Sequence, residues 1–149
     1  MLVEYKNQVF NAENIGENKL NIWKYVAVEG FERKVTNSGQ VYYESIIERS
    51  AVESCFSVKF LAEMDKRIFG ISDINKDLID IICDDYEYAM ENGFVELERG
   101  VWINRKPLYS FSNFQMVKSI QDSSEKIIEN ISMEELTGMW NKYVSEVSI

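Results

Sequence analysis

The 149-residue chain contains no histidine, one proline and two cysteines. Without histidine it lacks the usual general base near neutral pH, every serine–histidine or cysteine–histidine nucleophile pair, and the most common metal ligand. The two cysteines, Cys55 and Cys83, are too few for a disulfide framework. No apolar run approaches the ~20 residues that a membrane-spanning helix needs. These absences exclude most hydrolase mechanisms and predict a soluble protein that is not an enzyme.

Glycine-rich loops that cradle phosphates are also missing, so we predict no nucleotide cofactor and assign no catalytic residue, metal or other cofactor. The chain begins Met1-Leu2-Val3-Glu4, with neither a basic region nor a long apolar segment. We therefore expect no secretory signal and a cytoplasmic location. Apolar residues make up 46% and charged residues 28% of the chain, which is typical of a globular protein. The length predicts a single domain over residues 1–149.

Acidic residues outnumber basic ones by 25 to 16, which gives a net charge of −9. Nucleic acids and anionic membranes both require a positive surface, so we expect neither of them as a partner. Residues 73–98 alone contain nine acidic residues and one base, a net of −8, whereas the other 123 residues have a net charge of −1. The acidity therefore belongs to one segment, and a basic protein is the expected partner.

Several segments have the composition of strands, because they mix β-branched and aromatic residues and are separated by turns that contain Asn and Gly. They are residues 2–10, 20–28, 41–47, 55–63, 68–71, 94–98 and 100–104. Within 55–63 one side, with Phe56 and Phe60, is apolar and the other carries Ser57 and Lys59, which is typical of a half-buried strand. The sequence predicts an α+β fold with a mostly antiparallel sheet of about 4–6 strands.

An acidic amphipathic helix is predicted in the middle of the chain, from Ser72-Asp73 to Asn92-Gly93. Ser or Asp can cap the start of a helix, and Asn-Gly is a common end. Five apolar residues fall on one face of this helix at 100° per residue: Ile74, Leu78, Ile81, Ile82 and Ala89. Asp85 falls on the same face, so we expect it to form a structural hydrogen bond there. Five carboxylates share an arc of about 80° on another face: Asp77, Asp80, Asp84, Glu87 and Glu91.

This acidic stripe is either a solvated face or a docking ridge for a basic partner. Solvated helix faces normally mix both signs of charge, which favours the ridge. Glu87 and Glu91 also lie near the helix end that disfavours negative charge. Flanking residues Glu96, Glu98 and Trp102 supply further charge and an aromatic anchor. The predicted partner-binding residues are Asp77, Asp80, Asp84, Glu87, Glu91, Glu96, Glu98 and Trp102.

C-terminal helices are predicted to pack on the sheet. Ser132-Met133-Glu134-Glu135 has the pattern of a capping box, in which Ser132 and Glu135 exchange hydrogen bonds with backbone amides. Apolar residues follow at helical spacing: Leu136, Met139, Trp140, Tyr143, Val144 and Val147. A shorter helix is expected over residues 122–131, and residues 108–121 carry no clear pattern.

Two stretches, NIWKYVAVEGFERKV (21–35) and DDYEYAMENGFVELERGVWINRKPL (84–108), resemble immunity proteins of bacterial polymorphic-toxin and contact-dependent-inhibition systems. The resemblance is in general style and points to no specific family. It implies an inhibitor that binds a cognate basic toxin, often a nuclease, and occludes its active site or substrate groove. An acidic patch that faces a basic groove would also raise the association rate.

Two other functions fit the same residues. A DNA mimic would use the acidic stripe to block a DNA-binding or defence enzyme. A carboxylate–metal enzyme would use Asp84-Asp85 with Glu87, or Glu96 and Glu98 followed by Arg99. The hypothesis of a carboxylate–metal enzyme is the weakest, because the twelve-residue calcium loop and a basic surface for nucleic acid are both missing.

Overall fold

The computed structural model describes residues 1–148 and consists mostly of β-structure. Twelve strands, which pair antiparallel, hold more than half of the chain, and the main helix lies at the C-terminus. The prediction of an α+β fold with 4–6 strands and a central helix is therefore wrong. None of the helices in residues 1–148 has the length and apolar character needed to cross a membrane.

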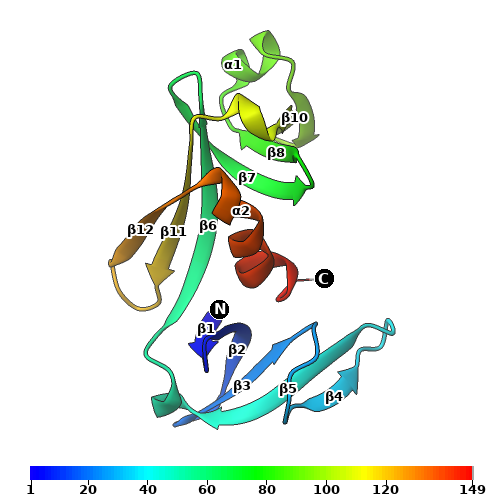
Figure 1. Ribbon diagram of the computed structural model, residues 1–149, viewed down its shortest axis with the longest axis vertical. Coiled ribbons are helices and arrows are strands. Elements are labelled where there is room, and N and C mark those ends of the chain that lie inside the picture. Colours follow the sequence, from blue (N-terminus) through cyan, green and yellow to red (C-terminus); the bar gives the residue numbers. More distant parts are fainter. Residues whose placement is uncertain (149) are drawn as a thin grey trace. The chain divides into compact units, whose positions relative to one another are not determined.

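The strands follow one another through hairpins for most of the chain (Figure 1). They are β1 (Leu2–Tyr5), β2 (Gln8–Gly16), β3 (Lys19–Lys24), β4 (Glu32–Val35), β5 (Val41–Glu48), β6 (Cys55–Met64), β7 (Arg67–Asn75), β8 (Leu78–Cys83), β9 (Val95–Glu98), β10 (Val101–Pro107), β11 (Asn113–Ile120) and β12 (Lys126–Ile131). The helices are α1 (Tyr86–Glu91) and α2 (Met133–Trp140), and α2 continues as a π-helical turn over Asn141–Ser145.

The chain forms two compact units. Unit 1 contains Met1–Ser57, Ser119–Lys126 and the residues from Gly138 on, and unit 2 contains Val58–Lys118 and Ile127–Thr137. The boundary cuts through β6, β11, β12 and α2, so these elements have residues in both units.

Unit 1 is an antiparallel sheet in the order β4-β5-β3-β2-β1, and the first residues of β6 pair with β1. Its inner face is an apolar core that includes Val3, Phe10, Leu20 and Ile22. Strand β3 alternates between buried and partly exposed residues, as a strand with one covered face must. The C-terminal residues pack on the same unit, where the Tyr143 hydroxyl donates a 2.7 Å hydrogen bond to Glu4 Oε1.

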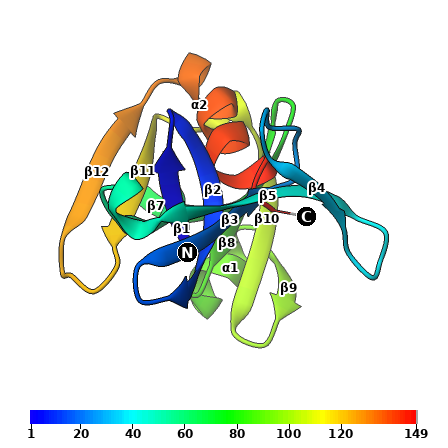
Figure 2. The same cartoon turned by 90° about the horizontal axis from the view of Figure 1, so that it is seen from below.

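Unit 2 is a second antiparallel sheet in the order β6-β7-β8-β10-β9, with β11 pairing to β6 and β12 to β11. Phe60, Ile79 and Ile81 are fully buried on its inner face. Phe69 and Phe94 stack with ring centroids 5.9 Å apart. Strand β9 is the outermost strand beside β10, and all four of its residues are exposed (Figure 2).

The predicted helix over residues 73–92 is replaced by a hairpin and a short helix. Strands β7 and β8 meet at a two-residue turn in which Lys76 has a positive φ of 57°. The segment after the turn holds the β-branched residues Ile79 and Ile81, whose alternation buries one face of a strand. Within this range only α1 (Tyr86–Glu91) is helical, and it ends at Asn92-Gly93 as predicted.

The remaining predictions have mixed outcomes. The strands over 41–47 and 55–63 are confirmed as β5 and β6, and 94–98 and 100–104 form the β9–β10 hairpin. The helix over 122–131 is wrong, because Lys126–Ile131 is the edge strand β12. The unassigned residues 108–121 form a 3-10 turn and β11. The capping box is confirmed, since Ser132 N donates to Glu135 Oε1 and Glu135 N donates to Ser132 Oγ.

Candidate functional site

The predicted partner-binding residues all belong to unit 2 but do not share one helix. Asp77 lies in the β7–β8 turn, Asp80 on β8 and Asp84 in the link between β8 and α1. The other members are Glu87 and Glu91 on α1, Glu96 and Glu98 on β9, and Trp102 on β10. The stripe of five carboxylates on a single helix therefore does not exist. Only Glu87 and Glu91 keep the one-turn spacing that the stripe required.

Asp80 is held by a base from the neighbouring strand. Arg105 on β10 lies opposite Asp80 and donates two hydrogen bonds, from Nε to Oδ1 at 2.7 Å and from Nη2 to Oδ2 at 3.1 Å. This hydrogen bonding and the negative charge of Asp80 raise the pKa of Arg105. Asp73 lies opposite Asp80 on β7, so a charged row of Asp73, Asp80 and Arg105 crosses three strands.

Asp85 has the structural hydrogen bond that the sequence predicts, but as the N-cap of α1. Its Oδ1 accepts from the Tyr88 backbone amide at 3.1 Å, and its Oδ2 forms an ion pair with Arg67 at 3.3 Å. The Tyr88 amide, followed by Arg67, lowers the pKa of the Asp85 carboxyl. The Arg67 guanidinium also lies 4.1 Å from the centre of the Tyr88 ring. The Asp85 carboxylate therefore serves as the N-cap of α1.

Trp102 is 9% exposed and belongs to the core of unit 2. Its ring meets the edge of Tyr86 on α1, with the two centroids 5.5 Å apart. Tyr86 is exposed, so the accessible aromatic side chain here is Tyr86, which packs against the buried Trp102.

The strand register also creates an apolar row on the outer face of unit 2, which the sequence analysis missed. Successive cross-strand partners are Leu61 on β6, Gly70 on β7, Ile82 on β8, Ile103 on β10 and Val95 on β9. Residues directly opposite one another in neighbouring strands point to the same face. We call these five residues the outer row. The buried residues Ile79, Ile81 and Cys83 alternate with Ile82 on β8, so the outer row faces away from the core.

The outer row is partly open to solvent, since Leu61, Gly70, Ile82 and Ile103 are half-buried and Val95 is exposed. Val95 at one end is 68% exposed, and Ile68, two residues before Gly70 on β7, is 62% exposed. The side chain of Ile82 covers Gly70, because an added Cβ there would lie 3.1 Å from Ile82 Cγ1. A hollow of about 420 Å³ lies over this part of the face and is lined by Ile68, Ile82, Val101 and Asp84, among others. Gly70 also lines this hollow.

Carboxylates border the outer row. The charged row of Asp73, Asp80 and Arg105 flanks it, Asp84 lines its hollow, and Glu98 lies opposite Val101. An apolar centre with a charged border is typical of a surface that binds another protein. No three carboxylate or thiol side chains in residues 1–148 gather closely enough to hold a metal ion.

The sequence does indicate this face, but some of the same apolar residues also fit the period of a helix. Ile68 and Ile82 are apolar residues on strands β7 and β8, whose other face is also apolar. An apolar run on both sides of a strand is typical of strands that are covered on both faces. Comparison of the chain with protein-family models, with curated proteins and with solved structures found no match.

Proposed function

We propose that the protein binds a basic protein partner through the outer face of unit 2, and that it acts as an immunity-type inhibitor of a basic toxin. The observation that carries the proposal is the partly exposed outer row, which crosses five strands and is bordered by carboxylates. The net charge of −8 in residues 73–98 supports a basic partner.

The two parts of this face have different roles in binding. Ile82, Ile103 and Val95 supply the apolar surface that a partner covers, which provides most of the affinity. The exposed acids Asp84 and Glu98 at the border of the outer row attract the partner and speed encounter, because opposite charges steer association. Glu87, Glu91 and Glu96 lie elsewhere on unit 2 and add to the negative charge that acts over longer distances. A second copy of this chain is a poor occupant, since two such borders repel each other.

The apolar centre also distinguishes this function from DNA mimicry. A protein surface that receives DNA is polar and strongly positive, so its mimic needs mainly ordered negative charge. Five neighbouring apolar positions would contribute little to such a mimic. They suit a partner whose own surface combines apolar residues with lysine or arginine.

The test starts from the product of the neighbouring gene, where that product carries a basic toxic domain. Co-expression of this chain should protect cells from that domain, and the purified pair should bind one to one. The double variant Ile68→Lys and Val95→Lys should lose binding at least about tenfold, because lysine on this apolar face repels a basic partner. Both positions are more than half exposed, so the fold tolerates the change.

A matched control is Val35→Lys on β4, another exposed position on an edge strand but in unit 1. It should leave binding unchanged. A separate variant, Glu87→Lys with Glu91→Lys, should slow association about tenfold and reduce its salt dependence. Full binding by the Ile68/Val95 variant would overturn the assignment of this face.

A further inference from the structure

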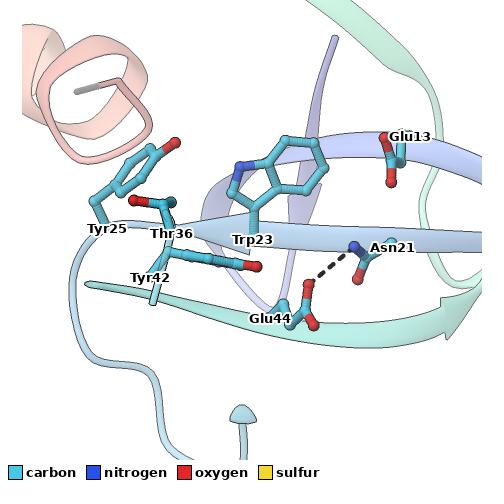
Figure 3. Close-up of a pocket in the computed structure, with 7 residues that line it drawn as sticks. All are labelled: Glu13, Asn21, Trp23, Tyr25, Thr36, Tyr42 and Glu44. Carbon is cyan, nitrogen blue, oxygen red and sulfur yellow. Dashed lines mark hydrogen bonds between the residues drawn. The ribbon is translucent and has the colours of Figure 1, made fainter. Parts of the chain in front are cut away.

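The outer face of unit 1 carries a small hollow formed by β2, β3 and β5 (Figure 3). Its volume is about 220 Å³, which is below the roughly 300–1,000 Å³ of pockets for drug-sized ligands. The register builds it, because Trp23 lies directly opposite Glu44 and Asn21 lies directly opposite Glu13. The hollow therefore suits a ligand the size of one side chain.

One end of the hollow is aromatic. Tyr25 and Tyr42 have ring centroids 6.5 Å apart and planes inclined by 60°, and the Trp23 indole stands beside them (Figure 3). All three side chains are partly exposed, so their rings are accessible. Aromatic faces carry negative charge density and attract cations, most strongly in the case of tryptophan.

The other end of the hollow is acidic. Glu44 Oε2 accepts a 3.1 Å hydrogen bond from Asn21 Nδ2, which orients the carboxylate. Lys34 lies 3.9 Å from Glu44 Oε1 but closer, at 3.2 Å, to Glu32 Oε1. Hydrogen bonding to Glu32 and the charge of that residue raise the pKa of Lys34. Glu13 is exposed, and its carboxylate forms no hydrogen bond or ion pair within residues 1–148.

We propose that this hollow binds a guanidinium group, as in an arginine side chain presented by a peptide or protein. A guanidinium is flat, so it stacks on the Trp23 indole while its N–H groups reach Glu44 and Glu13. Its methylene stem can lie along the rings of Tyr25 and Tyr42. An ammonium is more strongly hydrated and does not stack, so it binds more weakly. This site lies in unit 1 and stands independently of the function proposed for unit 2.

The test uses Nα-acetyl-arginine amide as the probe and Nα-acetyl-citrulline amide as its neutral analogue of nearly the same shape. Titration of the ¹⁵N-labelled full chain should move the indole N–H signal of Trp23, assigned with the Trp23→Phe variant. We expect saturation at about millimolar arginine amide, and binding of the citrulline probe at least about tenfold weaker. The corresponding lysine amide should fall between them.

Glu44→Gln should weaken arginine-amide binding several-fold, because it removes the charge and retains an oxygen for the Asn21 hydrogen bond. Glu48→Gln is the matched control. It lies four residues further along β5, on the same face, and does not line the hollow. A site that binds arginine and citrulline amides equally, an unmoved Trp23 signal, or equal losses in the two glutamate variants would overturn the proposal. None of these results depends on the partner of unit 2, so the two proposals fail separately.

Discussion

The two units are built alike but differ in their outer faces. Each is an antiparallel sheet with large apolar residues on its inner face. The outer face of unit 1 combines aromatic and acidic side chains around a small hollow, whereas that of unit 2 has an apolar row bordered by carboxylates. The burial of the apolar side chains on the inner faces explains why both units fold. The outer faces do not pack in these cores, so their residues can differ without loss of the fold.

The largest expected effect concerns the two cores. Phe10→Ala in unit 1 and Phe60→Ala in unit 2 should each cost about 3–5 kcal/mol of unfolding free energy, because both rings are fully buried. Strand β6 has residues in both units, so both variants should lower the same cooperative transition. Urea unfolding followed by fluorescence and circular dichroism tests this. Two separate transitions, each sensitive to one variant only, would show that the units fold independently.

A smaller effect is expected at a buried charge in unit 1. The Lys24 ammonium is 3.3 Å from Glu146 Oε2 and 5.0 Å from the centre of the Phe10 ring, and Lys24 is only 3% exposed. Glu146→Gln should destabilise the protein by about 1–2 kcal/mol, because it leaves a buried ammonium without its carboxylate. Lys24→Met should cost less, since methionine fills a similar volume without charge. Equal losses in the two variants would contradict this order.

In unit 2, the cap of α1 should make stability sensitive to acid. The Asp85 carboxyl has a lowered pKa because it accepts the Tyr88 amide bond and pairs with Arg67. The stabilisation is present above the unfolded-state pKa of about 4 and is lost as the pH falls through the lower folded-state pKa. Asp85→Asn keeps a capping oxygen, so its melting temperature should approach that of the wild type as the pH falls below about 4. A constant difference between pH 7 and pH 3 would exclude a role for the charge.

The smallest effect compares one exposed isoleucine on each outer face. Ile46 on β5 and Ile68 on β7 are 61% and 62% exposed. Replacing either with serine should change the unfolding free energy by less than about 0.5 kcal/mol. Only Ile68→Ser should weaken partner binding, because only Ile68 lies on the proposed docking face. A clear loss of stability in one variant would show that its isoleucine is covered in the free protein.

Local patterns predicted several elements correctly. Strand β6 follows from the alternation of Phe56 and Phe60 with polar residues, and the capping box identified the start of α2. The central helix was wrong because Ile74, Leu78, Ile81 and Ile82 fit a 3.6-residue period although they belong to two strands joined by a turn. Asn or Gly would have marked that turn, but it is formed by Lys76 and Asp77.

The outer row and the hollow lay beyond sequence analysis for a different reason. Leu61 and Ile103 are 42 positions apart, and only the pairing of the intervening strands aligns them. Trp23 and Glu44 likewise come together through the β3–β5 register. Bulges between Ile71 and Asp73 and between Val101 and Trp102 shift the alignment in ways that residue spacing does not reveal.

Strands β4 and β9 end the sheet order of their units, so each has one edge that is not paired with the strands of that order. An edge strand offers unpaired amides and carbonyls that a strand from another copy can join. Strand β9 reads Val-Glu-Leu-Glu and β4 reads Glu-Arg-Lys-Val. If two β9 strands met edge to edge, Glu96 and Glu98 of each copy would repel those of the other. The charges that we propose attract a basic partner thus also oppose edge-to-edge pairing of two copies, and replacing both glutamates with glutamine would remove this repulsion.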